Sequence, residues 1–120
     1  MKLPFKMSFI GMFLFGLIAC SDSPQQPDPD FTPSNTHKSF TKENSPVVFV
    51  DEAHNNFLTA NGRYKPFSQV LESDGYTVRP NKSRFSSEYL NNADILVIAN
   101  ALDKSRRNWT PPFTAALTDK

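Results

Sequence analysis

The sequence predicts an α/β domain with a parallel sheet of about three strands, which follows a signal peptide and a disordered tether. Apolar, β-rich runs at residues 47–50, 76–78 and 95–98 alternate with segments of helical periodicity. Strands that alternate with helices over such distances indicate right-handed βαβ crossovers, and therefore a parallel sheet. Residues before 46 lack this alternation, so the domain is expected at residues 46–120.

The first 19 residues have the pattern of an export signal. Lys2 and Lys6 precede an apolar run over residues 7–19, which is shorter than the roughly 20 residues of a membrane-spanning helix. The run ends in Leu-Ile-Ala-Cys at residues 17–20, which resembles the lipobox of bacterial lipoprotein precursors. That resemblance implies cleavage before Cys20 and attachment of diacylglycerol to its thiol. The alternative, an ordinary secretory signal, leaves an unpaired thiol in an exported protein.

Lipidation of Cys20 predicts a cell-envelope protein whose membrane partner is bound through the N-terminal lipid. Two or more acyl chains anchor a protein stably, because each buried methylene contributes about 0.8 kcal/mol. Ser21 follows the cysteine, which by the enteric sorting rule favours the outer membrane, on the side facing the periplasm.

The residues that follow have the composition of a tether. Residues 20–45 are rich in Ser, Pro, Asp, Asn and Thr, including Pro24, Pro27, Pro29 and Pro33. Proline fixes φ and removes an amide donor, and the polar residues offer too little apolar surface to offset the entropy of ordering. We therefore expect a disordered segment that extends by roughly 3 Å per residue where it is polyproline-like.

The domain begins with residues 47–50, a continuous apolar run typical of a strand buried on both faces. The 3.6-residue spacing of apolar side chains predicts a helix over residues 64–73, with Pro66 in its first turn and Gly75 as its left-handed cap. Residues 76–78 are expected to form a short strand. Ser86 can cap a brief helix that runs to residue 90, and residues 95–98 form a second fully apolar strand.

The C-terminal residues 113–120 look like the start of another helix, with no strand after it. About 75 residues are few for a doubly wound sheet, and small cores are marginally stable. Two explanations follow: the domain is a shortened version of a larger one, or a partner completes its sheet. We favour the first.

Charge and motif spacing exclude two classes of function. Removing the signal leaves 11 basic and 12 acidic residues, a balance that predicts no nucleic-acid binding. Residues 51–54 spell Asp-Glu-Ala-His, as in the Walker B box of helicases, but no Gly-rich phosphate loop precedes residue 47. An ATPase is therefore excluded, and no cofactor is expected.

Most of the domain resembles a bacterial family of unknown function whose members have a class I glutamine amidotransferase-like, flavodoxin-like fold. The similarity lies in residues 48–55, 63–64, 66–67, 71, 74–76, 93–100, 108–109 and 112–114. The resemblance implies a partial flavodoxin-like, doubly wound parallel sheet. It does not imply amidotransferase activity, because the chain has no cysteine besides Cys20.

In a flavodoxin-like sheet, ligands bind beyond the carboxyl ends of the first and third strands. The candidate ligand-binding residues follow these two strands: Asp51, Glu52, His54, Asn56 and Asn100. Carboxylates and an imidazole can bind a metal, exchange protons, or hydrogen-bond an envelope protein or a small polar ligand. They can also satisfy backbone amides of their own loop. We expect a non-catalytic binding domain, and the alternative is a hydrolase or metal-dependent enzyme that uses Asp51, Glu52 and His54.

Overall fold

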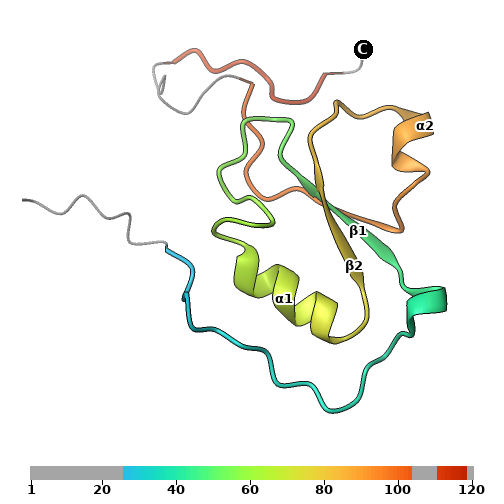
Figure 1. Ribbon diagram of the computed structural model, residues 1–120. Coiled ribbons are helices and arrows are strands. Elements are labelled where there is room, and N and C mark those ends of the chain that lie inside the picture. The colour runs from blue at the N-terminus through green and yellow to red at the C-terminus, as the bar shows by residue number, and fades with distance from the viewer. Residues whose placement is uncertain (1–25, 104–110, 119–120) are drawn as a thin grey trace, which may run out of the picture.

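The computed structural model describes residues 26–103 and 111–118 as a small α/β fold. Along the chain lie a 3-10 turn, η1 (Lys42–Asn44), and then β1 (Val47–Asp51), α1 (Lys65–Ser73), β2 (Thr77–Asn81), α2 (Ser87–Leu90) and β3 (Ile95–Val97). The predicted alternation of strands and helices is therefore confirmed (Figure 1). Within the described ranges, no helix has the length and apolar character needed to span a membrane. The predicted signal peptide and Cys20 lie outside these ranges.

β1 is the central strand of a three-stranded parallel sheet with the order β2-β1-β3. The chain moves from β1 to β2 in one direction and from β2 past β1 to β3 in the other. Because both crossovers are expected to be right-handed, α1 and α2 belong on opposite faces of the sheet, as Figure 1 shows. A strand covered on both faces must be apolar on both, which explains the continuous run in β1.

The core lies on β1. Val48, Phe49 and Val50 are buried, and Ala60 is the other buried apolar residue of the described chain. Phe49 packs against Tyr89 of α2, with ring centroids 5.3 Å apart. Successive side chains of a strand alternate between faces, so Val48 and Val50 lie on the α1 side.

Both helices end where the sequence predicts, and α1 begins one residue later than expected, at Lys65. Pro66 lies in the first turn of α1, and Gly75 follows its C-cap with a φ of 100°. This left-handed conformation costs glycine little. Ser86 caps α2, since its hydroxyl accepts a hydrogen bond from the Tyr89 amide at 3.2 Å.

The outer strands differ from the prediction at their ends. β2 extends through Pro80 to Asn81, beyond the expected residues 76–78. Proline is tolerated there because β2 is an edge strand with one unpaired side. β3 ends at Val97 rather than Ile98, and Ile95 and Ile98 are each 42% exposed because β3 is the other edge of the sheet.

The predicted C-terminal helix is wrong over the residues that the structure describes. Residues 111–118 contain no helix. Two prolines open this segment, and so short an isolated stretch cannot offset the cost of nucleating a helix. Instead, the Thr114 hydroxyl donates a hydrogen bond to the Asp103 carboxylate, which ties the segment to the chain after β3. Residues 108–109, which carried part of the family resemblance, lie outside the described residues.

Part of the predicted tether contacts the domain. The Asn35 side chain and the Ser39 amide donate to the Asp74 carboxylate at 3.0 and 2.8 Å, and the Phe40 ring packs on Tyr76 with centroids 4.8 Å apart. Figure 1 shows this segment running past α1 toward the start of β1.

Candidate functional site

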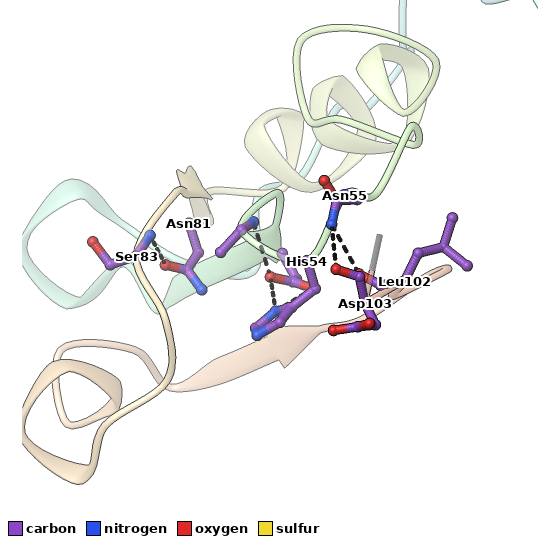
Figure 2. Close-up of polar contacts among 8 residues, drawn as sticks. His54, Asn55, Asn81, Ser83, Leu102 and Asp103 are labelled. Atoms are coloured by element: carbon purple, nitrogen blue, oxygen red, sulfur yellow. Dashed lines mark hydrogen bonds and ion pairs between the residues drawn. The ribbon is translucent and has the colours of Figure 1, made fainter. Parts of the chain in front are cut away.

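The candidate site lies at the carboxyl edge of the sheet, where all three parallel strands end. Asp51 is the last residue of β1 and pairs in register with Asn81, the last residue of β2. Both side chains are 0% exposed. Figure 2 shows this edge with residues from the three loops that follow the strands: His54, Asn55, Asn81, Ser83, Leu102 and Asp103.

Asp51 and His54, which the sequence predicts in one site, are in direct contact. Nδ1 of His54 lies 2.9 Å from Oδ1 and 3.1 Å from Oδ2 of Asp51. Because a carboxylate only accepts, Nδ1 carries the hydrogen and donates it. The His54 ring also packs on Phe85, with centroids 4.7 Å apart, and its side chain is 13% exposed. Asp51 thus fixes the orientation of an imidazole that solvent still reaches.

Glu52 has a different role. Its carboxylate accepts a hydrogen bond from the Ala60 amide at 2.9 Å, and its own amide donates to the Asn81 carbonyl at 2.8 Å. Side-chain alternation continues past the end of β1, so Asp51 lies on the α2 side with Phe49 and Glu52 faces the α1 side. Glu52 therefore holds the loop that leads into α1.

The predicted asparagines are distributed over the loops. The Asn56 carboxamide accepts from the Leu58 amide at 3.0 Å, and its Nδ2 is buried without a partner among the described residues. Asn55, with a φ of 51°, donates to the carbonyls of Leu102 and Asp103 at 3.0 and 3.1 Å. Asn100 is partly buried in the segment after β3.

The loop after β1 is fastened to the segment after β3. Besides the two bonds from Asn55, the Leu102 amide donates to the His54 carbonyl at 2.7 Å. These bonds bring the residues that follow the two strands together at the expected switch point, with His54 and Asn55 on one side and Leu102 and Asp103 on the other.

A cavity of about 200 Å³ lies beside His54. Its polar lining residues include His54, Asn55, Arg84 and Asp103, and residues 115–118 also line it. The volume is below the roughly 300–1,000 Å³ typical of sites for drug-sized ligands. The cavity therefore suits a small molecule, for which the Arg84 guanidinium supplies donors, and Asp103 and the second ring nitrogen of His54 supply acceptors.

The chemistry of the donors does not suggest a metal site. Within the described ranges, no three His, Cys, Asp or Glu side chains form a group that could hold a metal ion. The Glu52 oxygen bonded to Ala60 faces the loop before α1, on the other side of the sheet from His54.

Sequence reasoning missed Asn81 and Arg84. Asn81 is buried, accepts from the Ser83 amide at 3.0 Å, and has an Nδ2 with no hydrogen-bond partner among the described residues. The candidate residues predicted from the sequence follow the first and third strands alone, and the second strand was expected at residues 76–78, which ends three positions before Asn81.

Comparison of the chain with protein-family models, with curated proteins and with solved structures finds no match. The arguments about function therefore rest on the residues and their geometry.

Proposed function

We propose that this chain is a lipid-anchored protein of the bacterial cell envelope whose α/β domain binds a small polar ligand or a partner and catalyses no reaction. The anchor rests on the lipobox-like residues 17–20 and on Cys20 as the only cysteine. The outer membrane, facing the periplasm, is the proposed location because Ser21 follows Cys20.

The anchor is tested by metabolic labelling with a fatty acid. The parent chain is expected to incorporate the label, and Cys20→Ala is expected to lose it and to accumulate as an unprocessed or soluble form. Cys20→Ser is a second variant that preserves polarity but cannot form the thioether. Incorporation of label into either variant would refute lipidation at this position.

We further propose that the domain is a partial flavodoxin-like domain of the glutamine amidotransferase-like type. The strand order β2-β1-β3 supports this, because a flavodoxin-like sheet begins with the order 2-1-3. Two helices on opposite faces agree with a doubly wound sheet. The proposal concerns the fold alone, since amidotransferase chemistry requires a nucleophile that this chain lacks.

The observation that carries the binding role is the placement of His54. Asp51 holds Nδ1, which directs the remaining ring nitrogen away from the carboxylate, and the ring borders a cavity that also contains Arg84. A carboxylate, a phosphate or a sugar hydroxyl can accept hydrogen bonds from the Arg84 guanidinium, and a sugar hydroxyl can also donate one to the second ring nitrogen of His54.

Binding is tested by NMR titration of the ¹⁵N-labelled chain from Ser21 onward with acetate, inorganic phosphate, glucose and N-acetylglucosamine. We expect one of these probes to shift the amides of His54 and Arg84, and Arg84→Ala to abolish the shift. Lys82→Ala removes an exposed cation of the same loop that does not line the cavity, and is the matched control. Shifts that are the same in both variants would refute a site at Arg84.

A hydrolase is the second candidate, and the Asp51–His54 contact is the observation that favours it. A carboxylate that orients an imidazole is also the arrangement of a general base. Glu52 would not take part, because its carboxylate bonds Ala60. Turnover of ester, amide or glycoside substrates that His54→Gln abolishes would favour the enzyme over the binding domain.

A further inference from the structure

The N-terminal segment before β1 is held against the domain at the C-terminal end of α1. Asp74 is the centre of this contact: its carboxylate accepts from Asn35 and Ser39, and its carbonyl accepts from the Phe40 amide at 3.1 Å. The Ser39 amide, and to a smaller extent Asn35, lowers the pKa of the Asp74 carboxyl, as expected when donors favour the charged form. We call residues 26–45 the strap.

Gly75 shows how closely the strap approaches. A Cβ at this position would lie 2.1 Å from the Phe40 carbonyl oxygen, so only glycine fits. Ser45 continues the contact by donating to the Gly75 carbonyl at 2.6 Å. The strap is therefore attached by backbone contacts as well as by the Asp74 side chain.

The strap extends back along α1 to its N-terminal end. Residues 31–35 and His37 line one hollow with Val70, Ser73 and Asp74. Gln26 lines another hollow with Leu58, Arg63 and Tyr64, just before α1 begins. The first described residue thus lies beside the loop at residues 58–64.

Gln26 lies only six positions after Cys20 along the chain. Because an extended chain spans at most about 3.3–3.6 Å per residue, Gln26 lies within about 20 Å of Cys20. If residues 20–45 were a free tether, the limit would be several times larger. We propose that the domain lies against the leaflet that holds the Cys20 lipid, with the loop at residues 58–64 facing the membrane. This inference rests on the proposed lipidation of Cys20.

The side chains at this end carry charges of both signs. Arg63 and the exposed Lys65 are cationic, and the Arg63 guanidinium lies 4.7 Å from the centroid of the Phe57 ring. Cations within a Debye length of about 8–10 Å are attracted to anionic lipids. Asp28 and Asp30 of the strap oppose this attraction, so the short connection rather than charge sets the orientation. His54 and the loop at residues 58–64 both lie between the carboxyl end of β1 and the start of α1, so the candidate site is at the same end of the domain.

Energy transfer to the membrane surface tests the orientation. The lipidated full chain is reconstituted in phosphatidylcholine–phosphatidylglycerol vesicles that carry an acceptor dye on a headgroup. Because the Cys20 thiol is used by the lipid, a cysteine introduced elsewhere is the only free thiol. Asn61→Cys places a donor dye in the loop before α1, and Asn91→Cys places it at the end of α2, toward the opposite edge of the sheet. Both positions are exposed.

We expect about twofold more transfer from Asn61→Cys than from Asn91→Cys, because the short connection from Cys20 to Gln26 limits their separation to about 20 Å. Insertion of 18 Gly and Ser residues between Ser23 and Pro24 leaves the folded part unchanged and should reduce transfer from position 61 to about that of position 91. Asp74→Ala removes the side-chain hydrogen bonds to Asn35 and Ser39 and should act in the same direction, with a smaller effect because the backbone contacts remain.

Two outcomes would overturn the inference while the proposed function stands. In the first, the protein is acylated but energy transfer is equal from positions 61 and 91. In the second, the insertion leaves energy transfer from position 61 unchanged. Absence of fatty acid on the parent chain would overturn the anchor and this inference together, so the two failures are distinguishable.

Discussion

Replacing His54 by alanine should lower the free energy of unfolding by about 2–4 kcal/mol. The Asp51 carboxylate is 0% exposed, and without the imidazole it keeps the hydrogen bond from the Ala53 amide at 3.2 Å. A hydrogen bond to a charged group contributes about 1.5–3 kcal/mol, and the ring contact with Phe85 adds about 0.5–1.5 kcal/mol. The sum is a large part of the roughly 5–15 kcal/mol that stabilises a typical domain.

Urea unfolding of the chain from Ser21 onward, followed by circular dichroism, measures this loss. His37→Ala is the matched control, because His37 is exposed and its recorded hydrogen bond is made by the backbone amide. Its effect should stay within about 0.5 kcal/mol. In Asp51→Asn, the buried partner is neutral, so His54→Ala should cost about 1–2 kcal/mol less in that background. A loss below about 0.5 kcal/mol for His54→Ala in the parent chain would refute the reasoning.

Three further predictions concern the strap and the carboxyl edge. Gly75→Ala should destabilise the chain by about 1–3 kcal/mol in urea unfolding, because the added methyl group would clash with the Phe40 carbonyl and alanine would have to adopt a positive φ. A loss below about 0.5 kcal/mol would show that the strap does not stay in contact with the domain. The hydrogen bonds to the strap lower the pKa of the Asp74 carboxyl below its ordinary value of 3.8. The strap contact should therefore be fully present above pH 3.8 and weaken at lower pH, as the carboxylate of the folded chain becomes protonated. The Phe40 amide shift in NMR reports this transition, and a shift that does not change with pH would contradict it. Asn81→Asp places a second carboxylate beside Asp51 in a fully buried position, and should cost more than about 2 kcal/mol in urea unfolding, whereas a neutral result would show that this edge is open to water.

Local patterns predicted the elements whose causes are local. The apolar run of β1, the glycine cap after α1 and the Ser86 cap of α2 each depend on residues within a few positions of one another, and all three were confirmed. The C-terminal helix was wrong because periodicity over so few residues says little about helix stability. β2 was expected only over residues 76–78, whereas it runs to Asn81. An edge strand tolerates Pro80, and the sequence does not show which strand lies at the edge.

Long-range contacts could not be read from the sequence. Asp74 holds Asn35 and Ser39 across 39 and 35 positions, and no local motif marks polar residues that pair over such distances. The composition of residues 20–45 predicted a tether because these residues have little apolar surface. Composition does not reveal individual hydrogen-bond donors such as those of Asn35 and Ser39. In the candidate site, topology predicted correctly that Asp51 and His54 meet, whereas the direction of Glu52 depended on the face to which each side chain of β1 points.

The structural and binding interpretations of the site are compatible, because His54 can stabilise the fold through Nδ1 and still present its second ring nitrogen to the cavity. Asp51 and Asn56 both accept from the backbone amide two positions later, and Glu52 accepts from the Ala60 amide. Three of the five predicted ligand residues therefore shape the loop with at least part of their hydrogen-bonding capacity. The hydrogen bonds from loop amides to these carboxylates hold the loop in place. Because the loop is already ordered and His54 borders the cavity, little conformational entropy is lost when a ligand binds. The hydrogen bonds from loop amides to the carboxylates therefore support a binding role of His54.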